Sequence, residues 1–197
     1  MEKQSVEKAP VRRKPDWLKV KLPYGFKTKD VVGLLNDRRL HTICSSGMCP
    51  NKGECWAAGT ATFMICGDIC TRNCRFCNVS TRKPHALDAD EPEKVAETVK
   101  DLNLRHVVLT SVDRDDLSDY GASHWVKVIK EVKRVNPQVT MEVLIPDFMG
   151  RTDLLDQIID AAPEIISHNL ETVRRLTPEV RSVATYDRSL FVEINEK

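Results

Sequence analysis

The sequence has no marked excess of charge, no long apolar run and no hydrophobic leader. Its 30 lysines and arginines nearly balance 29 aspartates and glutamates over 197 residues, so the formal net charge is +1. That balance excludes electrostatic attraction as the main basis for binding nucleic acid or a membrane. An apolar run at residues 57–67 is far shorter than the roughly 20 residues of a spanning helix. We therefore expect a cytoplasmic protein without a transmembrane segment or a secretory signal.

Cysteine is absent from most of the chain. All seven cysteines lie between Cys44 and Cys77, and none follows. An odd number of clustered cysteines in an expected reducing compartment argues against disulfides and favours a metal or an iron-sulfur cluster. Hydrophobic residues make up 41% of the chain and charged residues 30%, which excludes wholesale disorder.

Strand-like and helix-like segments alternate after residue 60, which predicts an α/β fold with a parallel sheet and right-handed crossovers. Four βα units make only half of an eight-unit barrel of about 250 residues. We therefore expect a partial (β/α) barrel and a chain that is truncated relative to a complete barrel. We predict a loose arm at 1–22, a helix at 28–40, a cysteine and glycine loop at 41–59, strands at 61–66, 106–112, 141–145 and 164–167, and helices at 92–102, 123–135, 152–161 and 186–197.

Polar residues follow each predicted strand. Because parallel strands bring their carboxyl ends to one edge, these residues are expected to surround one active site. The alternative is that loops are polar in general, and a charge run at 113–116 is equally typical of a helix start. The strand-end residues are the cysteines after the first strand, then Ser111, Asp113, Arg114, Pro146, Asp147, His168, Asn169 and Glu171.

Three cysteines directly after the first strand, Cys70, Cys74 and Cys77, have the spacing C-x3-C-x2-C. Iron-sulfur clusters normally use four thiolates, so three of them suggest a cubane with one iron left open. An open metal position is typical of a catalytic site. A structural zinc site is the competing interpretation, with His85 as the fourth ligand. The intervening residues Arg72, Asn73 and Arg75 are expected to be solvated.

A second group of cysteines, Cys44, Cys49 and Cys55, has the spacing C-x4-C-x5-C. It again offers three thiolates without a fourth ligand. Two such triads within residues 44–77 make a protein with two clusters the simplest interpretation. Cys66 lies within the first predicted strand, so we expect it to pack as a small hydrophobe and not to bind metal.

The C-x3-C-x2-C loop, with Phe76 before its last cysteine, resembles the signature of the radical S-adenosylmethionine (SAM) enzymes. Within that superfamily, the chain from about Arg13 to Leu190 is similar to the lipoyl synthase family. The segments that carry this similarity are RKPDWLKVKLPYG, CSSGMCPNKGECW, TSVDRDDL, EVLIPDF, HNLETV and YDRSL.

The resemblance implies a radical SAM partial barrel at 60–197, preceded at 1–59 by an arm and an auxiliary-cluster loop. It implies insertion of two sulfur atoms into an octanoyl chain on a lysine of a carrier domain. In the family, the triad matching Cys70, Cys74 and Cys77 holds a 4Fe-4S cluster whose open iron binds SAM and whose electron cleaves it. The other matching triad, Cys44, Cys49 and Cys55, holds an auxiliary 4Fe-4S cluster that donates the sulfur.

The implied partners are octanoylated lipoyl carrier domains, such as 2-oxoacid dehydrogenase acyltransferase subunits and glycine cleavage H protein. An electron donor such as ferredoxin or flavodoxin is also implied. Neither nucleic acid nor a membrane is expected as a partner. For SAM, Phe76 is expected against the adenine, and Ser111, Asn169 and Glu171 near the amino acid or ribose.

The sequence departs from the family in three respects. The family's fourth auxiliary ligand is a serine in an Arg-Ser-Ser-Tyr motif near the C-terminus, and this chain ends before such a motif. Cys66 replaces a usual aliphatic residue, and Tyr120 replaces a usual glycine. We therefore expect the 197-residue chain to be inactive in lipoyl formation.

Two other functions are compatible with the cysteines. A zinc-binding interaction module would be colourless and indifferent to oxygen. Another radical SAM enzyme, of the biotin or RNA-modifying type, is expected to lack the triad at Cys44, Cys49 and Cys55.

Overall fold

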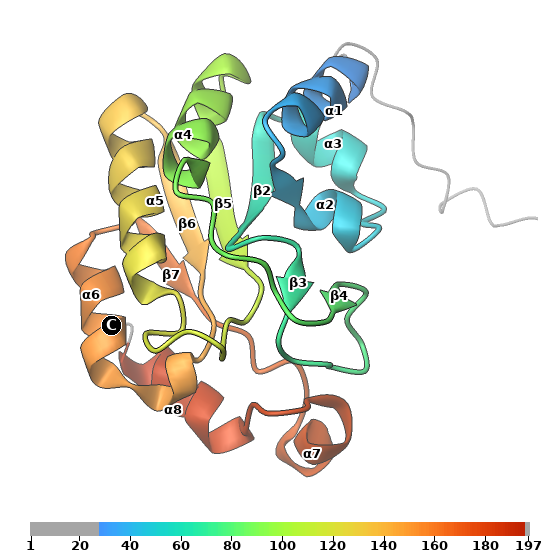
Figure 1. Cartoon of the computed structure of the whole chain (residues 1–197), viewed down its shortest axis with the longest axis vertical. Helices are drawn as coiled ribbons and strands as arrows, with labels where there is room; N and C mark the ends of the chain where they lie inside the picture. The colour runs from blue at the N-terminus through green and yellow to red at the C-terminus, as the bar shows by residue number, and fades with distance from the viewer. Residues whose placement is uncertain (1–27, 196–197) are drawn as a thin grey trace, which may run out of the picture.

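The computed structural model describes residues 28–195 (Figure 1), so the predicted arm at 1–22 lies outside the described residues. Four parallel strands form the centre of the fold in the order β2-β5-β6-β7. They are β2 (Thr60–Ile65), β5 (His106–Ser111), β6 (Thr140–Leu144) and β7 (Ile165–Ser167). All four confirm predicted strands, whose apolar and β-branched residues suit a sheet that is covered by helices.

Three helices cover one face of this sheet: α4 (Glu91–Asp101), α5 (Ala122–Val135) and α6 (Thr152–Asp160). Neighbouring helices contact each other, α4 with α5 and α5 with α6. In α5, Val128 and Val132 recur at a spacing of four residues and are fully buried, as an amphipathic helix requires. These elements confirm the predicted half barrel of alternating strands and helices.

Short elements lie at the carboxyl ends of the strands (Figure 1). They include the last helix, α8 (Tyr186–Asn195), which contacts the single turn η2 (Phe148–Gly150) that follows β6. Between β7 and α8 are η3 (Arg174–Leu176) and α7 (Thr177–Val180). None of the helices described between residues 28 and 195 has both the length and the hydropathy to cross a bilayer.

The predicted loop at 41–59 is wrong, because this segment contains regular structure. It forms β1 (His41–Thr42), α2 (Ile43–Ser46) and α3 (Lys52–Ala57), after the predicted first helix, α1 (Thr28–Asp37). Strand β1 pairs antiparallel with β2 and extends the sheet. The Thr42 side chain accepts a hydrogen bond from the Ser45 N–H and so begins α2. Elements this short show no detectable hydrophobic period.

A second small sheet closes the cysteine loop at its base. Strands β3 (Ile69–Cys70) and β4 (Ser80–Thr81) pair in parallel, with Cys70 opposite Thr81. Cys66 is buried as predicted, but it does not belong to a strand. Its φ of 67° turns the chain out of β2, and this left-handed backbone conformation cannot continue a strand.

Candidate active site

The first cysteine triad and the residues predicted to contact SAM come together in one cavity of about 370 Å³ at the carboxyl ends of β2, β5, β6 and β7, here called the main cavity. The cysteine loop supplies one part of its lining, and the strand ends supply another. Cluster binding by the cysteines and SAM binding by the strand-end residues stay predictions. The lining includes Cys70, Cys74, Phe76, Cys77, Ser111, Asn169 and Glu171.

Of the three cysteines, Cys70 is the most firmly fixed. Its Sγ accepts hydrogen bonds from the backbone N–H groups of Arg72 and Asp113, each at 3.4 Å. Burial raises the pKa of the Cys70 thiol to about 11, and the nearby Asp113 carboxylate adds to this shift. A metal must therefore displace a proton from Cys70, while the two N–H groups stabilise the thiolate that results.

The donor set suits a cluster with several irons. Among residues 28–195, no three His, Cys, Asp or Glu side chains converge as ligands of a single metal ion. A cubane distributes its thiolate ligands over separate irons, and three cysteines lining one cavity fit that arrangement. His85, the fourth ligand in the zinc interpretation, lines a different cavity.

Arg72 is buried, so the prediction of a solvated side chain is wrong. Only 4% of Arg72 is exposed. Its Nε and Nη2 donate to the two carboxylate oxygens of Asp115 at 2.7 and 2.8 Å, and Nη2 also donates to Asp147 at 2.8 Å. Its Nη1 lies 3.3 Å from Asp113. The other two intervening residues, Asn73 and Arg75, are exposed as predicted.

Two acidic partners of Arg72 have pKa values that are shifted in opposite directions. Burial raises the pKa of Asp113 to about 6, since the repulsion from Asp147 and Asp115 offsets much of the attraction to Arg72. Burial also disfavours ionised Asp147, but the hydrogen bonds from Arg72 and Arg188 outweigh it and lower its pKa. A network of charges, buried at Arg72 and Asp147 and half-buried at Asp113 and Asp115, therefore lies beside the main cavity.

The charge run at 113–116 is not a helix start, because the next helix, α5, begins only at Ala122. Asp113 and Asp115 bind Arg72, whereas Arg114 pairs with Asp116 and donates to the backbone oxygens of Cys66 and His85. Arg114 therefore faces away from the main cavity, unlike the other residues predicted at this strand end. The sequence signal for Arg72 was the presence of acids after two neighbouring strands, which require a cation when they are buried.

The second triad lies in α2, in α3 and in the turn between them, where the Cys49 N–H donates to the Cys44 carbonyl at 3.2 Å. Cys44 is buried, while Cys49 and Cys55 are half-buried. Burial raises the pKa of Cys55, and the neighbouring Cys44 and Cys49 raise it further, so the three thiols lie within electrostatic range. Ile43 and Gly47 of the same segment line the main cavity. The second triad therefore lies beside the first site.

A smaller cavity of about 130 Å³ shares Ser111, Asp113, Asn169 and Glu171 with the main cavity. His168 lines it, and its Nδ1 donates to the Ile145 carbonyl at 2.8 Å. Burial lowers the pKa of His168, so this histidine is neutral at physiological pH. The predicted strand-end residues Pro146, Asp147 and His168 all line this smaller cavity.

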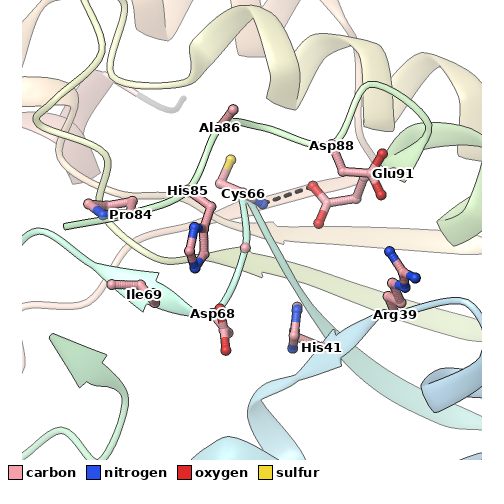
Figure 2. Close-up of a pocket in the computed structure, with 11 residues that line it drawn as sticks. Arg39, His41, Cys66, Asp68, Ile69, Pro84, His85, Ala86, Asp88 and Glu91 are labelled. Carbon is pink, nitrogen blue, oxygen red and sulfur yellow. Dashed lines mark hydrogen bonds between the residues drawn. The ribbon is translucent and has the colours of Figure 1, made fainter. Parts of the chain in front are cut away.

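A third cavity, of about 160 Å³, lies around Cys66 (Figure 2). Here Glu91 accepts a hydrogen bond from the Cys66 N–H at 2.9 Å, and the same carboxylate oxygen lies 2.6 Å from His124 Nε2. Because Glu91 begins α4 and His124 belongs to α5, the contact ties both helices to the end of β2. It braces the chain just before the cysteine loop.

Comparison with known proteins identifies the class. The profile of the radical SAM superfamily matches residues 64–192, and the chain therefore belongs to this superfamily. The cofactors of the superfamily are SAM and a 4Fe-4S cluster. A solved structure of methylornithine synthase has a TM-score of 0.54 at 14% sequence identity, over 88% of this chain and 52% of that one. At that identity the likeness concerns the fold alone.

The similar curated proteins narrow the comparison to lipoyl synthases. The chain is 64% identical over 181 residues to a lipoyl synthase of Treponema denticola, covering 92% of this chain and 62% of that protein. It is 63% identical over 180 residues to a lipoyl synthase of Parabacteroides distasonis, covering 91% and 64%. The chain thus spans less than two thirds of the length of these relatives.

Proposed function

We propose that the chain functions in lipoyl synthesis, the SAM-dependent insertion of two sulfur atoms into an octanoyl group on a carrier lysine. The observation that carries this proposal is the pair of cysteine triads, one lining the main cavity and the other beside it. One triad is expected for radical generation, and a second is expected where a sulfur donor is needed. The similar proteins of Treponema denticola and Parabacteroides distasonis are named lipoyl synthases, which supports the proposed reaction.

Cys70, Cys74 and Cys77 are the proposed ligands of the first cluster. When bound there, a 4Fe-4S cluster supplies the electron that cleaves SAM reductively. The chain itself orients SAM. Phe76 is 53% exposed on the cavity wall and offers an apolar face for the adenine. Ser111, Asn169 and Glu171 supply polar groups from two strand ends on the same cavity.

Cys44, Cys49 and Cys55 are the proposed ligands of the auxiliary, sulfur-donating cluster. They belong to the segment 1–59, which we assign to the auxiliary site, and we assign 60–197 to the radical SAM half barrel. The described part of the first segment adds β1 to the edge of the main sheet. This attachment supports a fixed position of the auxiliary site relative to the main cavity.

The proposed partners follow from the reaction. An octanoylated lipoyl carrier domain, of an acyltransferase subunit or of H protein, presents the substrate lysine. A ferredoxin or flavodoxin supplies electrons, and the cytoplasm is the proposed location because thiolate ligands persist in a reducing compartment.

The test uses two triple alanine variants in a chain extended to the length of the relatives. After anaerobic reconstitution, the variant at Cys44, Cys49 and Cys55 should still cleave SAM to 5'-deoxyadenosine, but it should give no sulfur-containing product on an octanoylated carrier. The variant at Cys70, Cys74 and Cys77 should do neither. Lipoyl product formed at the unaltered rate by the first variant contradicts the proposal.

A further inference from the structure

The position of Arg72 points to a role beyond general stability. Arg72 lies between Cys70 and Cys74, so its backbone belongs to the cysteine loop while its side chain is buried away from solvent. The guanidinium forms a two-pronged contact with Asp115 after β5 and a single contact with Asp147 after β6. A planar guanidinium is well suited to join carboxylates from different elements.

Backbone hydrogen bonds fix the same turn of the loop. The Thr71 N–H and hydroxyl both donate to the Asp113 carbonyl, at 3.1 and 3.0 Å. The Asp115 N–H donates in return to the Thr71 hydroxyl at 3.1 Å. The loop from Cys70 to Arg72 is therefore attached to the end of β5 through both backbone and side-chain contacts.

These contacts concern one cysteine more than the other two. Cys70 lies at the attached end of the loop and accepts the N–H groups of Arg72 and Asp113. Cys77 is exposed, and Cys74 is half-buried. The rest of the loop is held through its backbone, since the Asn73 N–H donates to the Ser182 hydroxyl at 3.0 Å and the Arg75 N–H to the Val180 carbonyl at 2.9 Å. Among the described residues, Cys70 differs from Cys74 and Cys77 in that backbone N–H groups also contact its sulfur.

The network depends on the charge of Arg72. Three carboxylates, Asp113, Asp115 and Asp147, are matched by two guanidinium groups, Arg72 and Arg188. Asp147 is only 1% exposed. Within residues 28–195, loss of Arg72 leaves Asp113 and Asp115 without an ion-pair partner and Asp147 with Arg188 alone, which disfavours the present position of the turn.

We propose that Arg72 is a positioning residue that holds Cys70 in its ligand geometry before iron binds, and that its charge helps to set the potential of the cluster. This inference rests on the proposed function of Cys70, Cys74 and Cys77 as cluster ligands. Cys70 is then the pre-positioned ligand sulfur, while Cys74 and Cys77 complete the site.

The first experiment uses the iron-free chain and does not depend on the cluster. Amide hydrogen exchange is measured for a peptide spanning 69–73 in wild type, Arg72→Gln and Arg72→Lys. The control is Arg75→Gln, the same substitution at the exposed arginine of the same loop. Loss of a hydrogen bond to a charged group should raise exchange in Arg72→Gln by about tenfold or more. Exchange in α4 should stay unchanged, as should the whole Arg75→Gln pattern.

The second experiment measures the midpoint potential and the electron paramagnetic resonance spectrum after reconstitution. Removing a positive charge beside the cluster should make the midpoint potential more negative in Arg72→Gln. Arg72→Lys keeps the charge, so its potential should stay close to that of the wild type. Asp113→Asn should shift the potential in the opposite direction. A purely structural role of Arg72 predicts lower stability without this pattern of opposite shifts.

The outcomes separate this inference from the proposed function. A wild-type chain that binds no cluster contradicts the proposed function, yet the exchange experiment still tests the positioning role. A cluster that assembles with the same potential in Arg72→Gln, together with unchanged exchange at 69–73, overturns the inference. If Arg72→Gln fails to fold, Asp115→Asn removes the two-pronged contact at a less buried residue and should raise exchange at 69–73 in the same way.

Discussion

Replacing Glu91 with alanine removes the acceptor that supports the end of β2. Glu91 is 5% exposed, and its Oε2 accepts a hydrogen bond from the Cys66 N–H at 2.9 Å (Figure 2). The same oxygen lies 2.6 Å from His124 Nε2. In the variant, the Cys66 N–H and the His124 ring lose their partner while they remain buried. We therefore expect this single substitution to cause a large decrease in the free energy of unfolding.

The magnitude follows from the two groups left unsatisfied. Each buried polar group without a partner costs about 1 to 3 kcal/mol, so Glu91→Ala should lower the free energy of unfolding by about 3 kcal/mol. Glu91→Gln retains an acceptor for Cys66 and should lose about 1 kcal/mol. A double-mutant cycle with His124→Ala should give a coupling of about 1 kcal/mol or more, since the two side chains are in contact.

Urea unfolding, monitored by circular dichroism, measures these differences in the free energy of unfolding. The comparison is valid if the dependence of that free energy on urea concentration is the same in all variants. Glu93→Ala is the matched control, because Glu93 lies two residues further along α4 and is exposed. A surface substitution of this kind should change stability by about 0.5 kcal/mol or less. The reasoning is refuted if Glu91→Ala costs no more than Glu93→Ala, or if the cycle shows no coupling.

Three further predictions concern the site. Cys66→Val should keep the full cluster content after reconstitution, because Cys66 is buried against the helices and lines a different cavity; loss of half the iron would contradict this. Asn169→Ala should raise the KM for SAM about tenfold with unchanged iron, as for loss of one or two hydrogen bonds; an unaltered KM would remove Asn169 from the SAM site. Burial lowers the folded-state pKa of His168, so the unfolded chain takes up the proton first, at about pH 6.5. Stability should therefore fall as pH decreases below that value, and His168→Asn should flatten this part of a urea-midpoint series; an equally steep series in the variant would contradict the assignment.

The sequence was sufficient to predict the central sheet and its helices. Strands such as β5 combine β-branched residues with defined ends, and helices such as α5 repeat their valines at the helical period. The gathering of Ser111, Asn169 and Glu171 at one cavity also followed from the parallel topology, which places the ends of the strands at a common edge.

Features that depend on distant partners could not be predicted in this way. The burial of Arg72 requires carboxylates 43 and 75 residues away, and no local pattern distinguishes it from the exposed Arg75. Strand β1 is only two residues long and forms because β2 offers a free edge. Cys66 shows the same limit, since a run of apolar residues does not reveal where the backbone turns out of a strand.

The most direct test of the central claim is the iron and sulfide content of the anaerobically reconstituted chain, compared with that of its Cys70, Cys74 and Cys77 triple alanine variant. Two triads predict two brown 4Fe-4S clusters in the wild type, and the variant should lose the iron of one cluster while keeping the absorbance of the other. Iron and sulfide that do not fall in the variant would contradict the assignment of these three cysteines as cluster ligands.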